Sequence, residues 1–169
     1  MDFALENAHQ FWKEQAQLEA GKNRERRFQQ GRGPCNIFIL DTSSNVGEEG
    51  FIQMKETFCA IMNEYAKYPK TDENVTVLTC GKTTTFKHYY SNQYSGLKHC
   101  IDDVEYGGPC PLTAAFILPE GAICRGAGYT KVMEHFHIHP RLILISAGRP
   151  NDFTVMNDDE NLPIYGPAE

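Results

Sequence analysis

The sequence predicts an α/β protein in which a doubly wound, mostly parallel sheet is flanked by helices. Residues 36–40 form a run that is continuously apolar from Ile37, and residues 141–147 contain another, as is typical of strands buried on both faces in a parallel sheet. Residues 75–80 have strand composition, and helical patterns lie between these runs. Strands that alternate with helices indicate a doubly wound sheet, and 169 residues are enough for one such domain.

An extra helix is expected at the N-terminus, over residues 2–20. Its apolar residues, including Trp12, recur at helical spacing, and Gly21 suits the end of a helix. A basic, glycine-containing linker follows over residues 22–34, so that residues 1–33 precede the main domain. We favour a helix that packs on its own domain over one that docks onto a partner or a second copy of the chain.

The remaining elements of the main domain follow in a regular order. An amphipathic helix is expected over residues 48–67, and an antiparallel edge strand over residues 83–90 follows a Gly-Lys turn. Further helices are expected over residues 95–104 and 112–125, the second of them interrupted at Pro119. This order predicts a hairpin at one edge of the sheet and helices between the other strands.

Charge and composition argue against several classes of protein. The net charge is −6, and five acidic residues but no Lys or Arg follow Arg149, which disfavours a general nucleic-acid binder. No apolar run approaches the length of a membrane span, so no membrane partner is expected. The six cysteines form no CxxC pair, and the N-terminus lacks the pattern of a signal peptide. These observations predict a cytoplasmic protein with reduced thiols.

Motifs for chemistry are missing or weak. There is no GxSxG, GxGxxG or GxxxxGK[ST] stretch, so neither a serine hydrolase nor a nucleotide cofactor is expected. Cys80 ends a strand, but nothing in the sequence places a base beside it, which disfavours a thiol enzyme. His135, His137 and His139 alternate and could bind zinc together with Cys124, but we favour a solvated loop. The sequence therefore predicts no enzyme and no cofactor.

Four stretches occur in an order that resembles the von Willebrand factor A (vWA) domain, also called the integrin I-like domain. They are IFILDTSSN, VTVLTCGKTTTFKHYYSNQYSGLKHCIDD, GGPCPLTAAF and PRLILISAGRPND. Four ordered matches with suitable spacing are more specific than DTSSN alone. The resemblance covers residues 34–152 and implies a Rossmann-like sheet, to which the N-terminal helix is an addition.

The resemblance also implies a metal-ion-dependent adhesion site at the carboxyl edge of the sheet. Its five ligand positions fall on Asp41, Ser43, Asn45, Cys110 and Ala147. Asp41 and Ser43 keep the family's residues. Asn45 stands in place of a serine, Cys110 of a threonine and Ala147 of an aspartate. Because Mg²⁺ and Mn²⁺ prefer carboxylate and hydroxyl oxygens, this degenerate site is expected to hold no metal. Asp41 is instead expected to cap the following helix or to bond loop amides.

The function implied by the resemblance is that of a non-catalytic protein–protein interaction module. We expect it to be part of a larger intracellular protein and to bind without metal. The loops around Asp41, Cys110 and Ala147 would meet the protein partner. Two alternatives stay open: a self-associating scaffold domain that forms a homodimer, and an adhesion domain that binds its ligand through Mg²⁺ or Mn²⁺.

The chain ends soon after the strand at residues 141–147. We interpret residues 153–169 as an acidic tail and a truncated remainder of the domain, because the family continues with further strands. The family's strand order places residues 83–90 at one edge, followed by 75–80, 36–40 and 141–147. The last strand would then be an exposed edge of buried-strand composition. A homodimer through Arg141–Ala147 or through the N-terminal helix is therefore expected.

Overall fold

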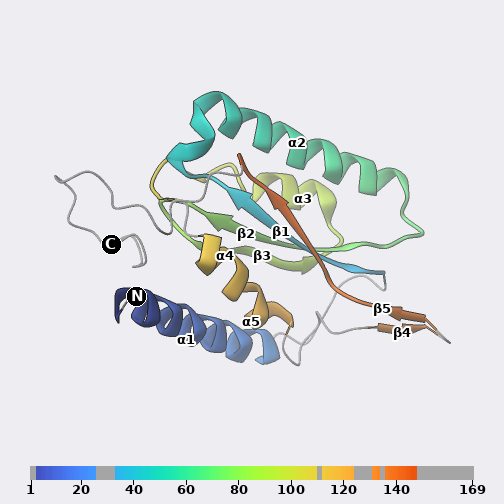
Figure 1. Ribbon diagram of the computed structural model, residues 1–169. Helices are drawn as coiled ribbons and strands as arrows, with labels where there is room; N and C mark the ends of the chain where they lie inside the picture. Colours follow the sequence, from blue (N-terminus) through green and yellow to red (C-terminus); the bar gives the residue numbers. More distant parts are fainter. Residues whose placement is uncertain (1–2, 26–32, 110–111, 124–130, 134–135, 148–169) are drawn as a thin grey trace.

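The computed structural model describes the chain at residues 3–25, 33–109, 112–123, 131–133 and 136–147. These residues form a mixed α/β fold whose main sheet has four strands in the order β3-β2-β1-β6 (Figure 1). The strands are β1 Cys35–Asp41, β2 Asn74–Cys80, β3 Thr85–Ser91 and β6 Arg141–Ile145. β1 pairs in parallel with β2 and β6, and β2 pairs antiparallel with β3, so the expected strand order is confirmed.

The central strands β1 and β2 are buried over their whole length, as their composition predicts. Successive residues of a strand point to opposite faces of the sheet. Phe38 and Leu40 therefore join the core on one face, whereas Ile37 and Ile39 join the core on the other. The apolar run at residues 37–40 thus supplies both layers of the core.

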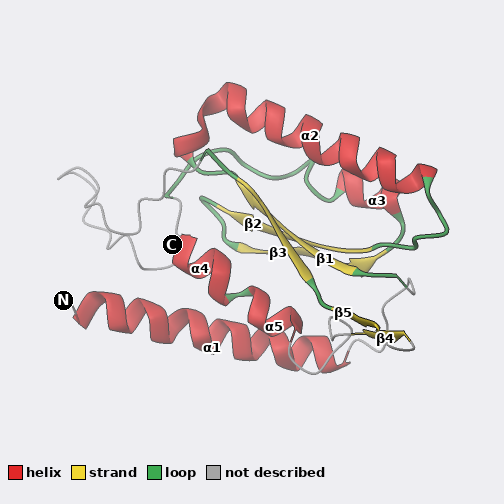
Figure 2. Ribbon diagram, turned by 45° about the vertical axis from the view of Figure 1, so that its right-hand side comes forward, coloured by secondary structure: helices red, strands yellow, loops and turns green. Residues whose placement is uncertain are grey.

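Helices cover both faces of the sheet (Figures 1 and 2). One face carries α2 Gly47–Lys67 and α3 Tyr94–His99, and the buried side chains of Met54 and Phe58 pack against Phe38 there. The other face carries α1 Phe3–Glu25, α4 Leu112–Ile117 and α5 Pro119–Ile123. A short 3-10 turn, η1 Ser44–Val46, leads from β1 into α2.

The N-terminal helix α1 packs on its own domain, as favoured from the sequence. Trp12 and Ala16 are buried in the same cluster as Ile39 of β1, and α1 lies along α4 and α5 (Figure 2). The helix continues through Gly21 to Glu25, so the end expected at Gly21 is wrong. A glycine costs a helix only about 1 kcal/mol, which the packing of the preceding turns outweighs.

Three other element limits differ from expectation. The helix expected over residues 112–125 is two helices, because Pro119 lacks an amide hydrogen and begins α5 as a first-turn residue. The helix expected over residues 95–104 ends at His99 and is followed by a turn. β6 ends at Ile145, which leaves residues 146 and 147 in the loop at the edge of the sheet.

A second, two-stranded sheet lies where a loop was expected. β4 Lys131–Met133 and β5 Phe136–Ile138 pair as an antiparallel hairpin, in which Val132 is opposite His137. Strands this short give no periodic signal in a sequence. Two of the four residues considered as zinc ligands, His135 and Cys124, lie outside the described residues. The expected acidic tail at residues 153–169 lies outside them as well.

Candidate functional site

The carboxyl ends of β1 and β6 meet at one edge of the sheet. The chain leaves β1 through α2 to reach β2 on one side, while β6 lies on the other side of β1. In open α/β sheets, ligands bind outside the carboxyl ends of the strands at such a reversal of strand order. This edge is therefore the place in the fold where a binding site is expected.

Asp41, the last residue of β1, has a fully buried side chain that joins two strands. Its Oδ1 accepts hydrogen bonds from the backbone amide of Ser43 at 3.0 Å and from the Ser43 hydroxyl at 2.6 Å. Its Oδ2 accepts a hydrogen bond from the hydroxyl of Ser146, just after β6, at 2.7 Å. Asp41 thus bonds a loop amide, as expected, and it also ties the end of β1 to the end of β6.

Most polar side chains of the DTSSN loop form hydrogen bonds within the protein. The Ser43 Oγ accepts a hydrogen bond from the backbone amide of Asn45 at 3.3 Å and so caps η1. The amide and hydroxyl of Ser44 both donate to the carbonyl oxygen of Gly108, at 3.0 and 2.9 Å. These bonds hold the loop in one conformation beside the next loop of the edge.

Close backbone contacts join three loops at this edge. The amide of Gly107 donates to the carbonyl of Thr42 at 2.9 Å, and the amide of Lys82 donates to the carbonyl of Gly107 at 2.7 Å. Gly108 has a φ of 79°, and a Cβ at this position would lie 2.5 Å from the Cα of Lys82. A residue with a side chain would therefore force the two loops apart. The loops form a backbone platform next to Asp41.

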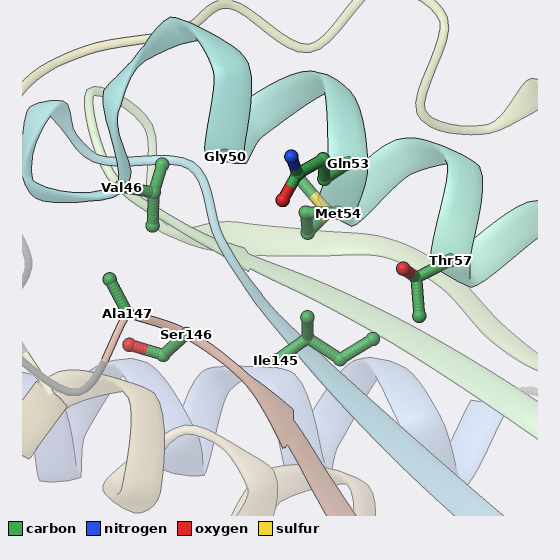
Figure 3. A pocket seen from close by; sticks show the side chains of 8 residues that line it. All are labelled: Val46, Gly50, Gln53, Met54, Thr57, Ile145, Ser146 and Ala147. Atoms are coloured by element: carbon green, nitrogen blue, oxygen red, sulfur yellow. The ribbon is translucent and has the colours of Figure 1, made fainter.

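A pocket of about 360 Å³ opens beside this platform, between α2 and the end of β6 (Figure 3). It is lined by Val46, Gly50, Gln53, Met54, Thr57, Ile145, Ser146 and Ala147. None of these side chains is charged, and Gln53, Thr57 and Ser146 offer hydrogen-bonding groups among apolar neighbours. A concave site that combines apolar side chains with a few placed polar groups is the usual form of a ligand-binding pocket.

The structure brings together most of the residues that the sequence singled out. Asp41, Ser43 and Asn45 lie in one hydrogen-bonded loop, and Ala147 lines the adjacent pocket. Cys110 lies outside the described residues. Ser146 was not predicted as a site residue, although a hydroxyl at the carboxyl end of a strand neighbouring β1 is a signal for a partner of Asp41.

The donor atoms that the structure describes at this edge do not fit a divalent metal ion. Asp41 is a single carboxylate whose two oxygens already accept hydrogen bonds from Ser43 and Ser146, and Ala147 supplies no ligand atom. Such ions require about six or more oxygen ligands in all, and here one carboxylate with engaged oxygens would be the only charged ligand among the described residues. In the described part of the chain, no group of three or more His, Cys, Asp or Glu residues is placed to hold a metal.

A second polar cluster lies at the other end of the parallel strands, where β1, β2 and β6 begin. Glu73 Oε2 accepts hydrogen bonds from Asn36 Nδ2 at 2.7 Å and from Arg141 Nη2 at 2.5 Å. The Tyr94 hydroxyl donates to the backbone carbonyl of Glu73 at 2.8 Å. Burial, together with the carboxylates of Asp72 and Glu73, raises the pKa of Tyr94 to about 12. These contacts fix the starts of β1, β2 and β6 relative to one another.

No protein-family model, curated protein or solved structure matches this chain. None of the described helices combines the length and the apolar character needed to cross a membrane. The function must therefore be inferred from the geometry of the carboxyl edge itself.

Proposed function

We propose that this chain is a non-catalytic protein-binding module of the vWA type, which binds its partner without a metal ion. The strand order and the helices on both faces support the doubly wound arrangement of that family. The DTSSN loop lies at the carboxyl edge of the sheet, where the resemblance places it.

The pocket between α2 and β6 is the observation that carries this proposal. It lies at the reversal of strand order, it has no charged lining, and it adjoins the outer strand β6. On β6, Leu142 and Leu144 remain 43% and 39% exposed. These leucines lie on the face of β6 opposite the pocket, so the β6 edge carries an apolar patch on one face of the sheet and a neutral pocket on the other. Exposed apolar residues at such an edge are expected of a surface that binds another protein.

Two other functions have less support. An adhesion domain that binds through Mg²⁺ or Mn²⁺ needs more oxygen ligands than Asp41 and its hydroxyl partners supply. A thiol enzyme needs a thiol that a substrate can reach, whereas Cys80 is fully buried in β2. We therefore assign no catalytic step and no cofactor.

We also place the module in the cytoplasm. Cys35, Cys59, Cys80 and Cys100 are all thiols, and two of them are buried among apolar neighbours. Reduced thiols suit a reducing compartment.

A photo-crosslinking amino acid placed at Gln53 tests this function. Gln53 lines the pocket, whereas its neighbour Ile52 is 56% exposed and does not line it, so the same probe at Ile52 is the matched control. In an extract of the native cells with EDTA present, we expect discrete protein adducts from the probe at Gln53 and not from the probe at Ile52. Mass spectrometry would identify the adducts.

A pocket-filling variant makes this experiment specific. Leucine at Gly50 would occupy the pocket, and a Cβ there makes only an ordinary contact of 3.5 Å with Val46. We expect Gly50→Leu to reduce the Gln53 adducts at least tenfold. Equal adducts from both probe positions, or adducts that form only with Mg²⁺, would contradict the proposal.

A further inference from the structure

The two edges of the main sheet differ in how well they are protected against pairing with another strand. β3, at one edge, pairs irregularly with β2 and carries Lys87 and His88. A bulge and a charged side chain are common devices that keep an edge strand from adding a neighbour. The β3 edge is therefore protected.

β6, at the other edge, has no bulge, and its one charged side chain, Arg141, lies at its first residue. Its sequence is Arg-Leu-Ile-Leu-Ile, and its register with β1 is regular over all five residues. Among the described residues, β1 is its only strand neighbour. Leu142 and Leu144 lie on the same face as Ile37 and Ile39, where α1, α4 and α5 cover the centre of the sheet but leave both leucines exposed. An apolar edge of this kind is a template for another strand.

We propose that the strand added to β6 is the β6 of a second copy of this chain, in an antiparallel pair about a two-fold axis at Ile143. This inference rests on the proposed function, because it names the partner of the same surface. Arg141 of one copy would lie opposite Ile145 of the partner subunit, and Leu142 opposite Leu144 of the partner subunit. The register uses all five residues of the strand and joins two four-stranded sheets into one.

Charge and side-chain chemistry favour a second copy in this register. Arg141 is the only charged residue of β6, and Glu73 of its own chain is its ion-pair partner. The two arginines would lie roughly 13 Å apart along the strands, at about 3.3 Å per residue, which exceeds the screening length of about 8 Å at physiological salt. The leucines would face leucines on the same side of the sheet. The edge is therefore complementary to itself.

The surface of α2 beside β6 extends this interface. Gly50, Gln53 and Thr57 lie on one stripe of α2 above the end of β6 and carry no charge (Figure 3). Stable interfaces bury about 1,200 Å² or more, so a short ladder of strand bonds needs such flanking contacts. Because the two-fold axis uses the β6 edge of each copy and leaves the protected β3 edges outside, the assembly closes at two copies.

Mass measured by light scattering and sedimentation over micromolar to submillimolar concentrations tests the pairing. We expect the full chain to pass from 19.1 kDa to twice that mass as concentration rises. Leu142→Lys with Leu144→Lys places like charges opposite each other and should weaken the dimer at least tenfold. Leu18→Lys is the matched control, because Leu18 is 59% exposed on α1, away from β6, and this variant should dimerise like the parent.

A charge-swap variant tests the register itself. Leu142→Lys with Leu144→Glu places opposite charges across the two-fold axis, so this variant should regain the dimer that the double lysine variant loses. Circular dichroism would show that each variant is folded. A dimer that survives the double lysine change, or that the charge swap fails to restore, would overturn the β6 pairing.

The protein that carries the photo-crosslinker at Gln53 also distinguishes failure of this inference from failure of the proposed function. In purified protein, the photo-crosslinker at Gln53 should yield an adduct between two copies. A chain that stays at 19.1 kDa throughout the range overturns the dimer, and slow amide exchange along β6 would then show that the chain itself covers the edge. If the Gln53 probe still captures a different protein in extract, the proposed function stands without the dimer; if it captures none, both fail.

Discussion

Asp41 is a buried carboxylate held by three hydrogen-bond donors from two segments of the chain. Two of them belong to Ser43, and the third is the hydroxyl of Ser146, which lies 105 residues further along the chain. A buried charge without such bonds is costly, so these donors allow the carboxylate to lie at the end of β1. The bond from Ser146 also aligns the end of β6 with the pocket.

Removal of this hydroxyl should lower stability. Ser146→Ala leaves Asp41 Oδ2 buried without that donor, so we expect the free energy of unfolding to fall by about 1–3 kcal/mol, measured by urea denaturation. Ser95→Ala is the control, because Ser95 is exposed on α3, and its effect should stay within about 0.5 kcal/mol. Equal stability of the two variants would show that the Asp41 bond to β6 contributes nothing.

At the scale of elements, the contact of α1 with α5 depends on a small residue. Gly121 of α5 lies so close to α1 that an added Cβ would be 2.5 Å from the carbonyl oxygen of Ala16 and 2.9 Å from the Cβ of Glu19. Ala16 and Ala20 are themselves buried at this contact. Small residues on both helices therefore let α1 cover this face of the sheet.

A methyl group at Gly121 should loosen this contact. Gly121→Ala must move α1 or α5 because it meets backbone atoms, and we expect a loss of about 1–3 kcal/mol in the free energy of unfolding. Gly96→Ala is the matched control on α3, where an added Cβ has no atom within 4 Å and the helix should gain up to about 1 kcal/mol. A Gly121 variant that gains stability like the Gly96 variant would refute the close packing of α1.

At the scale of the whole molecule, three tyrosines link the sheet to its surroundings. The Tyr90 hydroxyl donates to the carbonyl of Ala122 at 3.1 Å, and the Tyr94 hydroxyl donates to that of Glu73. Burial raises the pKa of Tyr65, Tyr90 and Tyr94. The folded protein thus keeps protons that the unfolded chain releases near pH 10.

Stability should therefore fall in alkaline solution. The stability that the protonated tyrosines contribute is fully present below a pH of about 10, the pKa of tyrosine in the unfolded chain. This contribution is lost as the pH rises toward about 12, the pKa of Tyr94 in the folded protein. Urea midpoints measured between pH 8 and about 11 should decrease, and the decrease should be smaller in Tyr94→Phe than in Tyr68→Phe, whose tyrosine is 59% exposed. Constant midpoints across this range would contradict burial of these hydroxyls.

The main sheet could be predicted from the sequence to a large extent, but its details could not. Composition identified the strands of the main sheet, and the resemblance supplied their order. The end of α1, the break before Pro119 and the β4–β5 hairpin were not predicted correctly. Each of these features depends on a contact with another element or on a segment of only a few residues. The periodicity of apolar residues along the sequence reveals neither tertiary contacts nor such short elements.

The sequence by itself determined that the central strand β1 is buried and which polar residues follow it, because burial on both faces requires a continuous apolar run such as residues 37–40. The composition of residues 141–147 also indicated burial on both faces, which is wrong, because β6 is an edge strand with no buried residue among its five. The sequence also determined that Ala147 offers no ligand oxygen. Only the tertiary structure decided that Ser146 reaches Asp41, that a neutral pocket lies between α2 and β6, and that Leu142 and Leu144 stay exposed. These features depend on segments about 100 residues apart in the chain, and only the folding of β6 beside β1 brings them together.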